Sequence, residues 1–77
     1  MVDYEAMDNK ETFVPHHMRG AYQRYFDFGI SPGSFGDAVI RGDRQAALDR
    51  ADFINKHHID SQIAWVKMNS QHTKKED

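Results

Sequence analysis

The sequence predicts an all-α domain, a compact bundle of three to four short helices with disordered termini. Glycine and proline–glycine positions divide the middle of the chain into segments whose apolar residues recur at helical spacing. No alternation of apolar and polar residues is long enough to predict a strand. The expected helices span residues of about 15–28, 32–41, 44–51 and 53–69.

The first expected helix carries the clearest periodic signal in the chain. Pro15 suits its opening turn because the φ angle of proline is already helical, and Gly29 suits a left-handed C-cap. A single apolar stripe runs along the helix through Met18, Ala21, Tyr22, Tyr25 and Phe26. We therefore expect this stripe to enter the core.

Capping residues define the remaining helices. Ser31 and Pro32 predict the start of the second helix, which Gly42 ends. Asp43 is placed to cap the third helix and Asp52 to cap a fourth. The sequence leaves open whether these two helices bend at Asp52 or continue as one rod. The fourth helix has a less regular apolar stripe, formed by Ile54, Ile59, Ile63 and Val66. Trp65 lies at the margin of this stripe.

Charge divides the chain into one domain and two polar ends. Residues 1–11 carry four acidic side chains and one basic side chain, a net charge of −3, and contain few apolar residues. The last residues are equally polar. We therefore expect a disordered acidic arm over residues 1–12, a helical domain over residues 13–70 and a disordered polar tail over residues 71–77.

Composition excludes several classes of protein. The chain has no cysteine, which rules out disulfides, thiolate zinc sites and a catalytic thiol. No apolar run reaches the roughly 18 residues that a membrane span needs, and the acidic N-terminus is unlike a signal peptide. We expect a soluble, cytoplasmic protein with no membrane partner.

Residues 14–55 contain a pattern of glycine, proline and aromatic positions. It reads P-x-H-M-R-G from Pro15, then Y-x-x-x-G-I-x-P-G-x-F-x-x-A-V from Tyr25, then Asp43 and the pair Ala51-Asp52. The pattern resembles that of a family of small helical proteins encoded by tailed bacteriophages, most of them uncharacterised. This resemblance covers more than half of the chain. It implies a phage origin and an infected bacterial cell as the location, and it supplies no catalytic residue.

The residues indicate no enzymatic activity, cofactor or metal. His57 and Asp60 fall on one helical face, but the neighbouring His57 and His58 point about 100° apart on a helix, so a shared ion would need a ligand from another segment. The loop after Pro32 follows a helix and lacks the lysine of a phosphate-binding loop. We therefore expect a protein that acts by binding.

Aromatic content indicates a protein partner. One tryptophan, three tyrosines and five phenylalanines are many for so small a domain, and exposed aromatic and arginine side chains are typical of interface hot spots. We assign Tyr25, Phe26, Phe35 and Phe53 to the core. We expect a non-enzymatic phage accessory protein that binds a bacterial host protein and modulates or inhibits it. The candidate interface residues are Arg19, Arg24, Phe28, Arg41, Arg44, Arg50 and Trp65.

Two alternative functions are kept. The helices on either side of Gly42 and Asp43 are compatible with a small helix-turn-helix DNA-binding regulator, although interleaved aspartates cancel most of the positive field that phosphate binding needs. The second alternative is a virion or assembly component. The small core also favours self-association, as a two-fold dimer through a helix face near Phe28 or Trp65.

Overall fold

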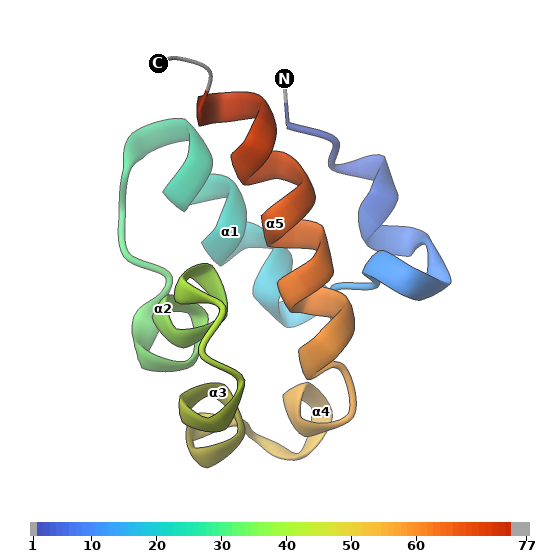
Figure 1. Ribbon diagram of the computed structural model, residues 1–77, viewed down its shortest axis with the longest axis vertical. Helices are drawn as coiled ribbons and strands as arrows, with labels where there is room; N and C mark the ends of the chain where they lie inside the picture. Colours follow the sequence, from blue (N-terminus) through green and yellow to red (C-terminus); the bar gives the residue numbers. More distant parts are fainter. Residues whose placement is uncertain (1, 75–77) are drawn as a thin grey trace.

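A computed structural model describes residues 2–74 of the chain and the side chains of residues 2–70. Within residues 2–74, two short 3₁₀ helices precede five α-helices, and no strand occurs. The all-α class is confirmed (Figure 1). The elements are η1 (Glu5–Asp8), η2 (Lys10–Thr12), α1 (His16–Phe28), α2 (Gly33–Arg41), α3 (Arg44–Arg50), α4 (Phe53–Lys56) and α5 (Ile59–Lys74).

The last helix, α5, lies at the centre of the fold, with α1 and α2 on one side and the N-terminal segment on the other (Figure 1). Its Trp65 is fully buried, and the indole ring lies 5.7 Å from the ring of Tyr22 and 5.5 Å from that of Phe26, measured between centroids. Tyr4 approaches the same indole at 6.1 Å. The prediction that Trp65 lies at the margin of the apolar stripe is wrong, because the N-terminal segment covers that side of α5.

Residues 2–12 pack against the body of the protein, so the prediction of a disordered arm is wrong for them. Met7 is only 2% exposed and belongs to the same buried cluster as Trp65. The backbone N–H of Asp3 donates to Asn69 Oδ1 at 2.7 Å, and the Asp3 carbonyl accepts from Trp65 Nε1 at 2.9 Å. The acidic side chains of the segment all stay exposed, and the segment therefore packs without burying charge.

The bounds of α1 agree with the prediction. Pro15 precedes the helix, and Gly29 ends it in the left-handed conformation with a φ angle of 73°. Met18 and Tyr22 are buried as expected, whereas Tyr25 and Phe26 are half-buried. The apolar stripe therefore faces the core most fully in the first half of the helix.

The start of α2 is a close-packed turn. Ser31 Oγ accepts a hydrogen bond from the Gly33 N–H at 3.2 Å. The N-cap of α2 is Pro32, however, so the prediction of Ser31 as the N-cap is wrong by one residue. A Cβ atom on Gly36 would stand 2.6 Å from the Cβ of Pro32, which is too close for two non-bonded carbons. A residue without a side chain is therefore required at position 36.

Two aspartates cap α3 and α4, as the sequence predicts. Asp43 Oδ1 accepts from the Ala46 N–H at 3.1 Å, and Asp52 Oδ1 accepts from the Asn55 N–H at 2.7 Å. The backbone is extended at Ala51 and Asp52. The chain therefore bends between α3 and α4, and these helices do not form one rod.

The helix expected over residues 53–69 is divided in two by a turn at His57 and His58. After the turn, α5 continues to Lys74, so the polar tail expected over residues 71–77 begins inside this helix. The part of that tail beyond Lys74 lies outside the described residues. Because α4 and α5 run in different directions, the apolar stripe predicted across both applies to α5 alone (Figure 1).

Truncating Met7 tests the packing of the N-terminal segment. Met7→Ala deletes a buried side chain and should lower the free energy of unfolding by about 2–5 kcal/mol, measured by urea denaturation. Glu5→Ala, in the same 3₁₀ helix, is the control and should change stability by less than about 0.5 kcal/mol because Glu5 is exposed. A Met7→Ala protein as stable as the wild type would contradict the packing of this segment.

Candidate functional site

Trp65 and Arg19, both expected at an interface, are used inside the fold. Trp65 is fully buried, so its side chain cannot contribute to the dimer face expected near Phe28 or Trp65. Arg19 Nε donates to the Val14 carbonyl at 2.7 Å, and its Nη2 donates to the Met7 carbonyl at 3.1 Å. A third nitrogen, Nη1, lies 2.9 Å from Asp8 Oδ1. Arg19 therefore fastens the N-terminal segment to α1.

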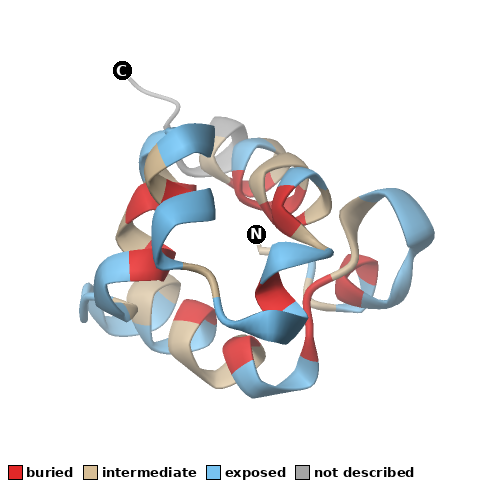
Figure 2. Cartoon of the chain, turned by 90° about the horizontal axis from the view of Figure 1, so that it is seen from below, coloured by how far each residue is buried: buried red, intermediate tan, exposed pale blue. Residues whose placement is uncertain are grey.

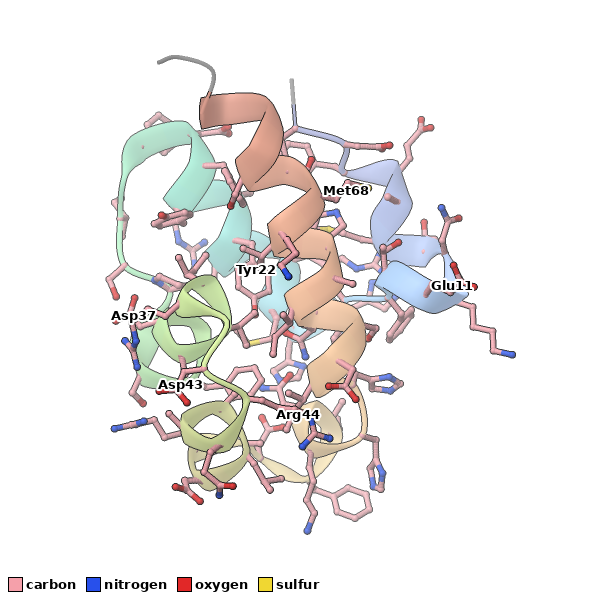
Figure 3. The ribbon with its side chains drawn as sticks, in the orientation of Figure 1. Glu11, Tyr22, Asp37, Asp43, Arg44 and Met68 are labelled. Atoms are coloured by element: carbon pink, nitrogen blue, oxygen red, sulfur yellow. The ribbon has the colours of Figure 1, made fainter. Side chains whose placement is uncertain are left out.

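The other predicted interface residues lie on several helices. Phe28, at the end of α1, is 74% exposed. Arg44 Nε donates to Asp60 Oδ1 at 2.7 Å and so links α3 to the start of α5. Figure 3 shows Arg44 in the lower half of the molecule. The remaining predicted arginines are exposed and lie on α1, α2 and α3, and they are Arg24, Arg41 and Arg50.

The surface formed by α4 is not predicted from the sequence. Phe53 and Ile54 are 77% and 52% exposed, whereas the next residue, Asn55, is only 3% exposed. This inverts the usual order, in which apolar side chains turn inward and amides turn outward. Phe53 was expected in the core, and that assignment is wrong because the burial of Asn55 turns the apolar side of α4 toward solvent.

A chain of hydrogen bonds explains why Asn55 is inside. Tyr22 Oη donates to Gln62 Oε1 at 2.7 Å, and Gln62 Nε2 donates to Asn55 Oδ1 at 3.1 Å. Burial raises the pKa of the Tyr22 phenol well above its usual range, so the hydroxyl keeps its proton and stays a donor. The chain reaches the surface through Asp52, which accepts from the Asn55 N–H and lies 3.0 Å from His17 Nε2. Tyr22 itself lies at the centre of the molecule (Figure 3).

An open groove of about 400 Å³ lies beside α4. The ring of Phe13 lies in it, 4.8 Å from the imidazole of His58, and the ring of Phe53 contacts that of His57 at 5.2 Å. Figure 2 views the molecule from this end, where exposed residues predominate on the nearest ribbon. We call this region the α4 surface, formed by Phe13, Pro15, His16, His17, Phe53, Ile54, His57 and His58.

Ligand-binding chemistry on this surface consists of apolar side chains and imidazoles. No group of three or more histidine, aspartate or glutamate side chains in the described part of the chain could hold a metal ion.

Within residues 2–74, no helix is both long and apolar enough to span a membrane. Comparisons with family models, with curated proteins and with solved structures found no match to this chain.

The pair α2 and α3 has the connection expected of a helix-turn-helix. Gly42 ends α2 in the left-handed conformation, and Asp43 caps α3. On α3, however, Arg44 is paired with a carboxylate of α5, and the Gln45 amide donates to Asp49 Oδ1 at 3.2 Å. On α3, Arg44 is therefore already paired, and Asp49 adds a negative charge nearby. This arrangement is poorly suited to binding the phosphates of DNA.

Tyr22→Phe tests the buried hydrogen bonds. The substitution deletes one hydroxyl and leaves Gln62 Oε1 without its donor, so the free energy of unfolding should fall by about 1–3 kcal/mol in urea denaturation. Tyr25→Phe, on the same helix, should change stability by less than about 0.5 kcal/mol, because the Tyr25 hydroxyl makes no hydrogen bond within the described residues. Equal losses in the two variants would argue against the chain of hydrogen bonds.

Asp52 gives stability a pH dependence. The hydrogen bond from the Asn55 N–H, together with the contact to His17, holds the pKa of Asp52 below its usual range. A pKa that is lower in the folded than in the unfolded chain means that ionised Asp52 stabilises the fold above the ordinary aspartate pKa of about 3.9. That stabilisation is lost as the pH falls through the folded pKa.

Asp52→Asn tests this pH dependence, because asparagine keeps the capping oxygen and loses the charge. The variant should be less stable than the wild type at neutral pH, and the difference should shrink as the pH falls below about 4. Urea denaturation across this pH range measures it. A difference in stability that stays constant down to acid pH would show that the charge of Asp52 has no part in it.

Proposed function

We propose that this chain is a non-enzymatic phage accessory protein that docks on a bacterial host protein through the α4 surface and modulates or inhibits it in the cytoplasm of the infected cell. The observation that carries the proposal is the exposure of Phe53 and Ile54 beside a buried Asn55. In an isolated domain this arrangement costs free energy, because Phe53 and Ile54 stay in water while the amide of Asn55 is removed from it. A covering partner offsets that cost.

Docking at α4 has favourable energetics. Covering Phe53 and Ile54 would contribute about 1.5–3 kcal/mol for each side chain. The Asp52 cap and the buried amide of Asn55 hold α4 in place before a partner arrives, so little conformational entropy is lost on binding. A small, preformed anchor of this kind is typical of interface hot spots.

The phage role is supported by the sequence pattern between residues 14 and 55. Several of its positions have structural uses, such as Gly29 at the end of α1 and Val39 in the core. Two others, His17 of the α4 surface and Asp52 beside it, lie 3.0 Å apart and connect the start of α1 to the cap of α4. The pattern that suggests a phage family thus includes residues that position the proposed docking surface.

The test compares two variants with matched exposure. Tagged wild-type protein captures its partner from a bacterial lysate, and calorimetry then measures the affinity of the purified partner for each variant. Phe53→Ser combined with Ile54→Ser should weaken binding by about tenfold or more, because apolar anchors are lost. Phe28→Ser removes a similarly exposed ring at the end of α1, a helix end that lies far from α4 (Figure 1), and this variant should bind like the wild type.

Both variants change exposed side chains and should fold, which urea denaturation checks. Full affinity in the Phe53/Ile54 variant, with loss in Phe28→Ser, would move the interface to the end of α1. Tight binding to duplex DNA that weakens steeply with added salt would favour the regulator instead. Recovery of the protein in purified virions would favour the assembly component.

A further inference from the structure

A second groove, of about 150 Å³, lies between the last turn of α2 and the middle of α5, and it shares no residue with the α4 surface. Its floor is apolar and is formed by the buried Val39 and Val66 together with the half-buried Ile40 and Ile63. An apolar cavity of this volume accommodates a group the size of benzene. The groove therefore has room for one large apolar side chain.

Two cationic side chains line the same groove, Arg41 from the end of α2 and Lys67 from α5, and both are exposed. Neither makes an ion pair or a side-chain hydrogen bond within the described residues. Arginine and lysine side chains stay protonated at neutral pH, so both charges are permanent. The groove thus joins an apolar floor to two positive charges that the fold leaves unpaired.

The acidic side chains of the neighbouring segments are engaged elsewhere. No aspartate or glutamate of residues 2–70 lines the groove. Asp60 pairs with Arg44 at 2.7 Å, and the Asp43 carboxylate caps α3. The two carboxylate oxygens of Asp37 accept from the Ser31 hydroxyl at 3.1 and 3.0 Å. Among the charged groups of residues 2–70, a ligand in the groove therefore contacts positive ones only.

We propose that this groove binds the carboxyl-terminal residue of a partner polypeptide, with an apolar side chain on the groove floor and the terminal carboxylate against Arg41 and Lys67. A terminal residue carries both groups on one Cα atom, so both fit where there is room for a single side chain. The guanidinium of arginine donates two parallel hydrogen bonds to a carboxylate, and the ammonium of lysine adds a second charge. The site lies outside the α4 surface and does not rest on docking there.

Other occupants fit this groove less well. A neutral apolar segment would cover the two cations without pairing them, which costs free energy. A long acyl chain needs more volume than the groove offers. Nucleic acids bind through several phosphate contacts, and two cations beside an apolar floor supply few of them.

The experiment titrates three short peptides into the isotopically labelled full chain and follows the backbone amide signals by NMR. The first peptide ends in phenylalanine with a free carboxylate, the second has the same sequence with a C-terminal amide, and the third has glycine in place of the phenylalanine. The first peptide should bind about tenfold more tightly than either of the others, because only it supplies both the ring and the charge. The largest shifts should include the signals of Ile40 and Gly42, which line the groove.

Two double variants with the same loss of charge separate direct contact from the net charge of the protein. Arg41→Gln combined with Lys67→Gln should bind the free-acid and amide peptides equally. Arg50→Gln combined with Lys56→Gln removes the same charge from exposed residues that do not line the groove, and this variant should keep the full preference for the free acid. Urea denaturation checks that both variants are folded.

Several outcomes would overturn the proposal. Equal binding of the free-acid and amide peptides would remove the carboxylate from it, and so would a preference that persists without Arg41 and Lys67. Equal loss in both double variants would show that only the net charge matters. Equally tight binding of an amide-ended peptide with an internal glutamate after the phenylalanine would exclude a requirement for the chain terminus. None of these results bears on docking at α4, because the Phe53/Ile54 variant leaves this groove unchanged.

Discussion

Within the core, the side-chain amide of Gln62 must find both a donor and an acceptor, because an unpaired polar group there costs about 1–3 kcal/mol. Tyr22 of α1 supplies the donor and Asn55 of α4 the acceptor. Apolar packing tolerates several relative rotations of short helices, but these two hydrogen bonds form only when their donor and acceptor atoms are aligned. The bond from Gln62 to Asn55 fixes the rotation of α4 about its own axis, and with it the side that faces solvent. The position of the α4 surface follows from a requirement inside the protein.

A helix as short as α4 has almost no stability of its own, since a single turn does not repay its nucleation. Two side-chain hydrogen bonds stabilise it, one at the Asp52 cap and one from Gln62 to the buried amide of Asn55. The N-terminal segment acts differently, because it covers Trp65 and leaves its acidic side chains in water. One segment thus closes the core while the other displays apolar side chains.

Local features of the fold could be predicted from the sequence, and features that depend on distant partners could not. Gly29, Asp43 and Asp52 act on neighbouring backbone groups, so their roles follow from the residues around them. The burial of Trp65 depends on Asp3, which lies 62 positions away, and no periodic pattern contains that contact. Phe53 looked like a core residue for a similar reason. Its exposure is decided by the buried amide of Asn55, two positions along, whose partner is on another helix.

The placement of the N-terminal segment on α5 also governs the order of events during synthesis. Translation proceeds at about 5–20 residues per second, so Met7 leaves the ribosome well before Trp65 exists. Until α5 emerges, the apolar side chains of the first segment have no native surface to cover. A nascent chain interrupted before α5 lacks both the central helix and the contacts of its covering segment, and it is open to proteases. Closure of the core thus has to wait for the synthesis of α5.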